Sequence, residues 1–322
     1  MVSKRSRILI VSICVSAALL SLLIVEFYLR TLGFGHPVLY DYDPAVGYAL
    51  RPEQDLARSG NCRISINNLG MRSDHNVVEK RRDGFRVLVL GDSVPYGGSY
   101  IDQDETFCNV AQRLLNQNGT KFEVLNAGVN AYGPQNVARY IKSRGLVDAD
   151  LVIVYFPWGN LRRDFSNFYV VPFWSNDPAL ALSEFLRHFT WGIFGSLSQK
   201  WKDTNAFQNE RVLAMNLDAL VEIKRSCDDS GKLVFFFWSP YLDTMTNKTP
   251  DKFRSDREEL EKRIPQECTV DMEPIFKRHG NLSSLYVDAV HYTTEGHNVA
   301  GKYLAEFILS HSDKWCPTRE HP

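Results

Sequence analysis

An apolar run that ends in a glycine constrains this chain more than any other feature. Residues 85–90 (FRVLVL) lead directly into Gly91, Asp92 and Ser93. A short run of branched apolar residues that a glycine interrupts is typical of a buried strand. Ser93 then falls on the turn between this strand and a helix. In an open parallel sheet the carboxyl edge is where ligands bind, so the run predicts both a sheet and the position of a site.

Strands and helices alternate along the rest of the chain. Further strands are predicted at residues 121–125, 151–156, 233–238 and 285–287, and helices at 106–115, 135–144, 209–225 and 295–309. Repeated alternation is typical of a parallel sheet that helices cover on both faces. We therefore expect an α/β fold with three layers.

The first thirty residues are expected to form a separate unit. Three cationic residues within 4–7 precede residues 8–25, eighteen residues without a charge and near the lower limit for crossing a bilayer. A cleaved signal peptide is the alternative, but its apolar region would be shorter, and residues 26–30 offer no small-x-small cleavage site. The cationic cluster favours a cytoplasmic amino terminus. We therefore expect a single-pass membrane anchor over residues 1–30, with the remainder periplasmic or extracellular.

Two further regions flank or interrupt the alternating part. Residues 31–84 show polar–apolar alternation at 63–66 and a turn signal at 67–70. They predict a small β-rich collar packed on the main domain, residues 85–316. Residues 161–205 form an insertion rich in Phe and Trp. Three interpretations of this insertion stay open: a segment with its own small core, a lid or substrate platform, or a contact with a membrane surface.

The composition disfavours one class of partner and leaves the cysteines open. A net charge of −1, without a basic excess, disfavours nucleic acid. Beyond Cys14 in the expected span, the cysteines are Cys62, Cys108, Cys227, Cys268 and Cys316. An oxidising compartment would permit disulfides between them, but small buried apolar residues are an equally good interpretation. No Cys-x-x-Cys or Cys/His spacing indicates a metal.

The end of the chain supplies the partners that a reactive serine needs. A serine hydroxyl is a weak nucleophile that requires a base, a group that orients the base, and donors for the developing oxyanion. His291 is the candidate base, and Asp288 is placed to orient its ring. His297, on the expected last helix, is a rival base. Oxyanion donors follow the ends of neighbouring predicted strands: the N–H of Ser93, an N–H in the loop 126–133, and the amide of Asn160.

Four short blocks, in this order, resemble those of the SGNH (GDSL-type) hydrolases, a family of esterases and acyl-transfer enzymes. The blocks are Gly91-Asp92-Ser93, the loop 126–133 (NAGVNAYG), Gly159-Asn160, and Asp288-Ala289-Val290-His291. The resemblance spans roughly residues 85–311 and implies a flavodoxin-like α/β/α fold. It also implies a catalytic triad of Ser93, His291 and Asp288, and an oxyanion hole formed by Ser93, Ala131 and Asn160.

The chain departs from the family pattern at two positions. Ala131 stands where the family has a glycine that donates its N–H, and Leu161 stands where an aspartate usually follows Asn160. An alanine keeps that N–H, provided that its backbone angles are accessible. Three residues in or beside the same loops are candidates for contact with the substrate or a lid: Gly128, Trp158 and Arg162.

Two functions of different kinds follow from these residues. The first is a serine esterase or O-acyltransferase that needs no metal or organic cofactor. Residues 66–72 resemble membrane-anchored family members, which implies O-acetylated envelope or exported polysaccharides as substrates, with lipid or small esters as alternatives. The second is a catalytically degenerate relative that binds glycan or serves envelope assembly, which the changes at 131 and 161 favour. One triad serves both hydrolysis and transfer, so these two reactions stay open.

Overall fold

A parallel sheet of five strands forms the centre of the molecule. The computed structural model describes residues 4–58, 60, 62–80, 84–118, 121–168, 174–190, 210–246 and 253–312. The strands lie in the order β6-β5-β7-β8-β9, and every neighbouring pair is parallel. Their bounds are Gly84–Gly91 (β5), Lys121–Gly128 (β6), Leu151–Pro157 (β7), Leu233–Ser239 (β8) and Thr269–Asp271 (β9).

Helices cover both faces of the sheet. The long helices are α3 (Phe107–Leu115), α4 (Pro134–Arg144), α7 (Glu210–Asp229) and α11 (Thr294–Ser312). Because side chains alternate along a strand, Leu88 and Leu90 of β5 pack in the core with α4 and α7, whereas Val87 and Val89 pack in the core with α3 and α11. This arrangement confirms the expected three-layer α/β/α fold with a parallel sheet.

Short helices connect these elements. The short α-helices are α2 (Ser93–Tyr96), α5 (Ala181–Thr190), α8 (Leu242–Met245), α9 (Arg254–Glu261) and α10 (Glu273–Lys277). The 3₁₀ turns are η2 (Gln103–Glu105), η3 (Asn116–Asn118), η4 (Trp158–Arg162), η6 (Gln266–Cys268) and η7 (Leu282–Leu285). The expected helices at 106–115, 135–144, 209–225 and 295–309 correspond to α3, α4, α7 and α11.

The fifth strand lies elsewhere than expected, and the strand predicted at 285–287 is wrong. Leu285 ends the 3₁₀ turn η7, and Tyr286 forms only an isolated antiparallel bridge with Tyr292. Val287 is exposed and closes a tight loop, because its N–H donates to the carbonyl of His291 at 2.8 Å. The sheet instead ends in β9, a three-residue edge strand beside β8. Its sequence, TVD, is too short and polar to be recognised as a strand.

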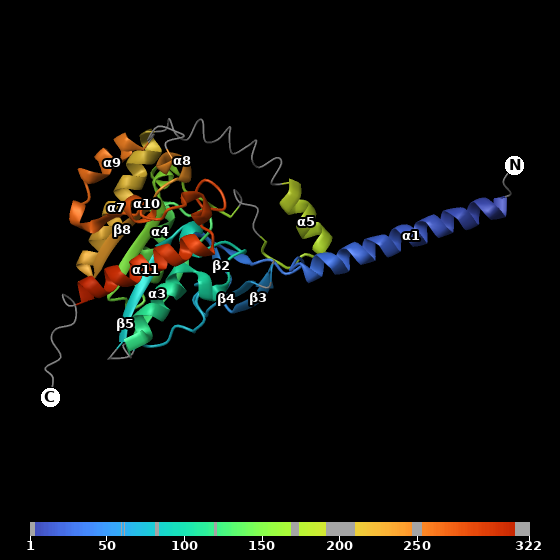
Figure 1. Ribbon diagram of the computed structural model, residues 1–322, viewed down its shortest axis with the longest axis horizontal. Helices are drawn as coiled ribbons and strands as arrows, with labels where there is room; N and C mark the ends of the chain where they lie inside the picture. The colour runs from blue at the N-terminus through green and yellow to red at the C-terminus, as the bar shows by residue number, and fades with distance from the viewer. Residues whose placement is uncertain are drawn as a thin grey trace.

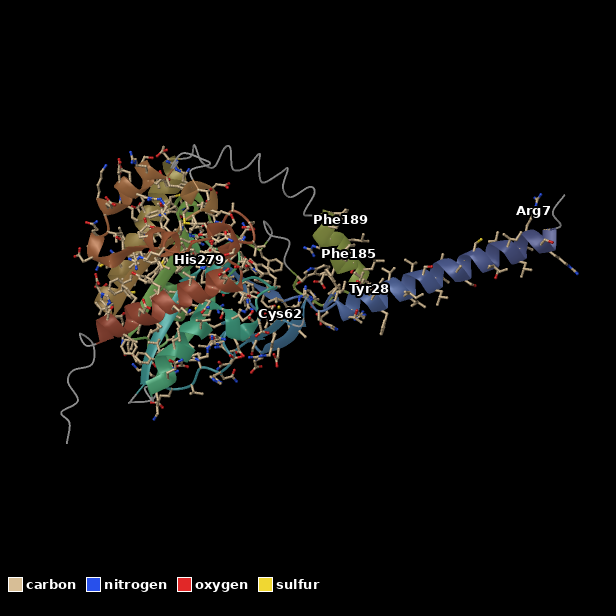
Figure 2. The ribbon with its side chains drawn as sticks, in the orientation of Figure 1. Arg7, Tyr28, Cys62, Phe185, Phe189 and His279 are labelled. Carbon is tan, nitrogen blue, oxygen red and sulfur yellow. The ribbon has the colours of Figure 1, made fainter. Side chains whose placement is uncertain are left out.

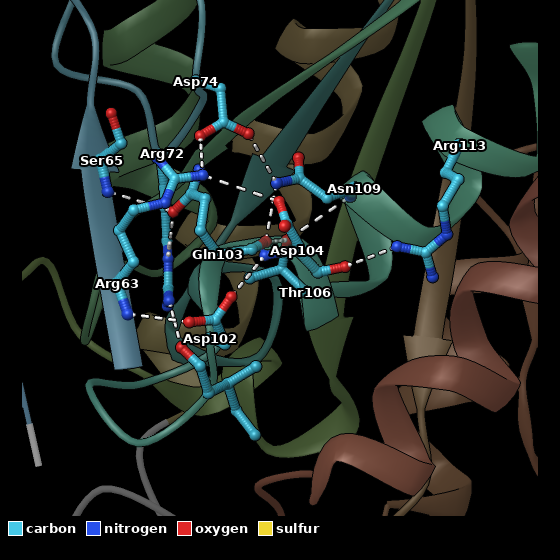
Figure 3. A network of polar contacts seen from close by, with 11 residues as sticks. Arg63, Ser65, Arg72, Asp74, Asp102, Gln103, Asp104, Thr106, Asn109 and Arg113 are labelled. Carbon is cyan, nitrogen blue, oxygen red and sulfur yellow. Dashed lines mark hydrogen bonds and ion pairs between the residues drawn. The ribbon is translucent and has the colours of Figure 1, made fainter. Parts of the chain in front are cut away.

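Two small antiparallel hairpins precede the main sheet. They pair β1 (Tyr40–Asp43) with β2 (Gly47–Leu50), and β3 (Gln54–Arg58) with β4 (Cys62–Ile66). The collar contacts the segment that follows Ser93 through a polar network (Figure 3). At its centre, the buried Arg72 donates to the carbonyls of Tyr96 and Gly98 at 2.8 and 2.6 Å. This arginine therefore ties the collar to the turn that carries Ser93.

A long apolar helix, α1 (Lys4–Thr31), leads into the collar and projects away from the sheet (Figure 1). Its length and composition are sufficient to cross a membrane, and none of its most apolar window is buried. A signal sequence meets the same description.

The aromatic insertion and the cysteines are described only in part. Tyr169, Phe173, Trp191 and Phe194 lie outside the described residues, as does Cys316. Within the insertion, Phe165 lies under the guanidinium of Arg139, at 4.1 Å from the ring centroid. The other five cysteines carry no disulfide, and Cys108 and Cys227 are buried.

Candidate active site

Ser93 stands at the carboxyl end of the central strand β5, as its position after the apolar run predicts. The last residue of the strand must be a glycine, because a Cβ on Gly91 would lie 2.1 Å from the carbonyl oxygen of Tyr155 on the neighbouring strand β7. Asp92 caps α2 and accepts a hydrogen bond from the N–H of Val94 at 2.9 Å. Ser93 is therefore the first residue of α2, partly exposed, on a backbone that both neighbours restrain.

The structure brings Ser93, His291 and Asp288 together. Oγ of Ser93 lies 2.8 Å from Nε2 of His291, and Nδ1 of His291 lies 2.7 Å from Oδ2 of Asp288. The other carboxylate oxygen, Oδ1, accepts the N–H groups of Val290 and His291 at 2.9 and 2.8 Å. A carboxylate only accepts hydrogen bonds, so Nδ1 carries the proton and Nε2 is free to accept the serine proton.

The charges in this cluster make His291 a stronger base. Partial burial alone would raise the pKa of Asp288, but hydrogen bonds from His291 and the backbone outweigh it and lower the pKa to about 2. Burial acts in the opposite direction on His291 and would lower its pKa. The hydrogen bond and negative charge of Asp288 outweigh this and raise the pKa of His291 above its ordinary value.

Two backbone N–H groups that follow the ends of the neighbouring strands β5 and β6 have no hydrogen-bond acceptor within the described part of the chain. They belong to Ser93 itself, at the start of α2, and to Ala131 in the loop after β6. Ala131 has a φ of 62°, in the left-handed region that glycine adopts without strain. The left-handed backbone of Ala131 gives a physical reason for a glycine at this position. Ala131 adopts these backbone angles and still carries an N–H that can donate a hydrogen bond.

Gly128 has a packing role at the end of β6. A Cβ there would lie 2.5 Å from the backbone nitrogen of Tyr96 in α2. Its N–H donates to Oδ1 of Asn126 at 3.0 Å, and Nδ2 of Asn126 donates to the carbonyl of Pro95 at 2.6 Å. Gly128 thus permits close contact between the β6 loop and the turn of Ser93.

The amide of Asn160 points differently from the expectation for an oxyanion donor. Nδ2 donates to Oδ2 of Asp92 at 2.9 Å and to the carbonyl of Tyr132 at 3.3 Å. An amide nitrogen carries two hydrogens, so both are engaged within the protein. On the other side, Oδ1 of Asn160 accepts from Nε of Arg163 at 2.9 Å. Asn160 therefore links Arg163 to the buried Asp92 beside Ser93.

Trp158 and Arg162 are placed in the packing of the domain, in contrast to the expected substrate or lid contacts. Trp158 is buried and stacks on Trp238, with ring centroids 4.4 Å apart. Arg162 makes two hydrogen bonds of 2.8 Å with the carboxylate of Asp256, which is fully buried. It also pairs with Glu210 at 2.9 Å. These contacts hold η4 against α7 and α9.

His297 takes no part in the contacts of Ser93. Its Nδ1 accepts the N–H of Phe107 at 3.2 Å, and its ring stacks on Phe107 with centroids 5.8 Å apart. Burial lowers the pKa of His297 to about 3, so the ring stays neutral. Arg163 is not among the residues that the sequence indicated, yet its positive charge lowers the pKa of both Asp92 and His291. Its spacing of three residues from Asn160 is the signal that could have indicated this role.

Comparison with known proteins finds similar proteins among solved structures only. No protein-family model matches the chain, and no curated protein matches it. A lipolytic protein of the G-D-S-L family from Desulfitobacterium hafniense is 15% identical over 69% of this chain and 98% of its own, with a TM-score of 0.42. The lipase/acylhydrolase from Enterococcus faecalis is 12% identical over 73% and 99% of the two chains, with a TM-score of 0.43.

A third likeness is to Axe2, an acetylxylan esterase from Geobacillus stearothermophilus. It is 14% identical over 74% of this chain and 100% of that one, with a TM-score of 0.46. Because the identities and TM-scores are this low, we base the chemistry of the site on the contacts within this chain and not on these similar structures.

Proposed function

We propose that this protein is a serine hydrolase of carboxylic esters, with Ser93 as nucleophile, His291 as general base and Asp288 as the group that orients it. The observation that carries the proposal is the pair of hydrogen bonds, 2.8 and 2.7 Å long, that joins these three side chains. A hydroxyl, an imidazole and a carboxylate within hydrogen-bond reach, in this order, form the arrangement that activates a serine.

The reaction begins with attack of Oγ of Ser93 on the acyl carbon of the ester. As the new C–O bond forms, the hydroxyl proton moves to Nε2 of His291, which already lies 2.8 Å away. The resulting imidazolium is stabilised by Asp288, whose lowered pKa keeps it ionised. When the C–O bond to the leaving alcohol breaks, His291 returns the proton to that alcohol, and the acyl group remains on Ser93.

The N–H groups of Ser93 and Ala131 are the proposed donors to the tetrahedral oxyanion. Both lack an acceptor within the described residues, and backbone donors held in place need no reorganisation during the reaction. We assign Asn160 a supporting position, because its amide hydrogens are engaged by Asp92 and Tyr132. Rotation of this amide toward the substrate would break both contacts.

The second half of the reaction determines the outcome. Attack of water on the acyl-serine gives an esterase, and attack of a sugar hydroxyl gives an O-acyltransferase. We propose acetyl esters of an envelope or exported polysaccharide as substrates, on the sequence resemblance to membrane-anchored members. We also propose that α1 anchors the enzyme with its catalytic domain outside the cytoplasm, because cationic residues precede the apolar helix.

One observation favours the alternative, a catalytically degenerate protein that binds glycan or serves envelope assembly. The Asn160 amide faces Asp92, and the aspartate that usually follows it is absent. A binding protein of this kind would fold normally but would not react with electrophiles at Ser93.

A fluorophosphonate probe separates the two functions. We would incubate the full chain in detergent with the probe and, in parallel, with p-nitrophenyl acetate. The proposal expects labelling and turnover, both abolished in Ser93→Ala. A folded protein that is inert to the probe and to the ester would overturn the enzymatic proposal and support the binding role. Adding acetylated donor and acceptor oligosaccharides then separates transfer from hydrolysis.

A further inference from the structure

Helix α5 carries an apolar stripe that faces outward. Leu182, Phe185, Leu186 and Phe189 follow the spacing i, i+3, i+4, i+7 and so lie on one face. The side chains of Phe185, Leu186 and Phe189 are 38, 49 and 57% exposed. A helix on the surface of a globular protein normally turns such a stripe toward the core. Within the described part of the chain, the stripe therefore stays largely without an apolar cover.

The amino end of α5 is attached to the end of α1. The carboxylate of Glu26 accepts the N–H groups of Ala181 and Leu182, at 2.9 and 3.0 Å, and so caps α5. Arg30, one turn later on α1, pairs with the same carboxylate at 2.8 Å. The two helices accordingly lie side by side at this point (Figure 1).

The opposite face of α5 is fixed to the collar, which determines where the stripe points. Glu184 is buried, accepts the N–H of Gly35 at 2.6 Å and pairs with Arg58 at 2.5 Å. On the stripe itself, the ring of Phe34 meets Phe185 edge to face, with centroids 5.6 Å apart, and still leaves Phe185 38% exposed. Because Glu184 is bound in this way, α5 cannot rotate its apolar stripe inward without breaking the buried ion pair between Glu184 and Arg58.

The position of Glu26 places α5 relative to a bilayer. Glu26 is the first charged residue after the eighteen uncharged residues 8–25. If residues 8–25 fill the hydrocarbon region, Glu26 lies at its boundary, and the start of α5 lies at the same level. Tyr28, two residues later, has an exposed ring at the level of the membrane–water interface, where Tyr and Trp are enriched (Figure 2).

We infer that α5 lies in the membrane interface and buries its apolar stripe, Leu182, Phe185, Leu186 and Phe189, among the lipids. The inference rests on the anchoring role proposed for α1 and adds a second membrane contact. Away from the stripe, the guanidinium of Arg187 lies over the ring of Trp174, at 4.4 Å from the centroid, and so helps to hold the polar side of α5 to the rest of the chain. The catalytic domain is thereby held against the bilayer at two points.

Quenching by spin-labelled lipids tests this placement. The full chain is reconstituted in phosphatidylcholine nanodiscs that contain a lipid with a nitroxide near the headgroup. Phe189→Trp puts a reporter in the stripe, and Ser183→Trp puts a matched reporter on the same helix outside it. The fluorescence of the unmodified protein, which has six tryptophans, is subtracted. We expect quenching at position 189 to be about twofold stronger than at 183, because an interfacial helix buries only one face.

The alternatives give distinct results. Equal quenching at the two positions overturns the inference. If a second copy covers the stripe instead, Phe189→Cys forms cross-linked dimers in detergent and the reporter at 189 is shielded from the lipid. If α1 does not anchor the chain, carbonate extracts the protein from membranes, and both the anchor and this inference fail. Fluorophosphonate labelling of each variant reports the proposed hydrolase separately, because quenching does not depend on activity.

Discussion

The guanidinium of Arg163 donates through Nε to the side-chain oxygen of Asn160 at 2.9 Å, and this contact fixes the orientation of the Asn160 amide. The nitrogen of the amide is thereby turned toward Oδ2 of Asp92, which caps the helix of Ser93. Leu161, an apolar residue, directly follows Asn160 and offers no side-chain hydrogen bond to hold the amide. Arg163 supplies an alternative means of orienting Asn160, from three residues further along.

Removal of this donor should reduce the reaction rate without unfolding the protein. Arg163→Met keeps an aliphatic stem where Cβ and Cγ of Arg163 pack near Gly133. Hydrogen bonds to charged groups contribute about 1.5–3 kcal/mol, so we expect a loss of roughly tenfold or more in kcat/KM, mainly in kcat. The positive charge of Arg163 also lowers the pKa of His291. The acidic limb of the pH–rate profile should therefore move to higher pH, which a purely structural defect would not cause.

The neighbouring arginine provides a contrasting prediction. Arg162→Met leaves the fully buried Asp256 without its partner. Breaking a buried pair from one side costs about 3–5 kcal/mol. We expect a large fall in melting temperature but near-normal kcat below the transition, measured by thermal unfolding and ester hydrolysis. A catalytic defect in a fully folded Arg162→Met protein would instead place this residue in the active site.

Activity should fall in acid with a midpoint above pH 6.5. His291 must be neutral to accept the serine proton, and Asp288 raises its pKa above the ordinary value. Protonation below that pKa removes the base. Asp288→Asn removes the charge that raises the pKa, so its acidic limb should move to lower pH while kcat falls by roughly 10³-fold or more. A pH–rate profile that is the same in both proteins would argue against His291 as the base.

The backbone of Ala131 makes a prediction about which residues can replace it. Its φ of 62° is accessible to glycine and tolerated by asparagine, but not by a β-branched residue. Ala131→Gly and Ala131→Asn should therefore retain activity within about threefold, because each keeps the N–H in place. Ala131→Val should lose activity by about tenfold or more, because strain displaces the donor. Similar rates for the three variants would remove Ala131 from the proposed oxyanion hole.

The sheet could be predicted where buried apolar runs mark it. The runs at 85–90, 121–125, 151–156 and 233–238 correspond to β5, β6, β7 and β8, because strands covered on both faces consist of apolar residues. The edge strand β9 has no such run. The spacing of Asp288 and His291 likewise predicted a local contact, because three residues in a tight loop suffice to join a carboxylate to the ring.

Loop contacts between distant segments could not be predicted in the same way. Arg162 looked available for a substrate, but its partners Asp256 and Glu210 lie 94 and 48 residues further along the chain. The direction of the Asn160 amide depends on Arg163 and Asp92, and no periodic pattern encodes a side-chain rotamer in a loop. The sequence pattern therefore predicted which strand ends meet, but not how the side chains between them pair.

The most direct test of the account is to locate the acyl group on the enzyme. The full chain is reacted with p-nitrophenyl acetate, quenched in acid and digested, and the acetylated peptide is sequenced by mass spectrometry. The account predicts a single acetyl group on Ser93, formed roughly 10³-fold more slowly in His291→Ala but at a near-normal rate in folded His297→Gln. Acetylation at another residue, or an unchanged rate in His291→Ala, would contradict it.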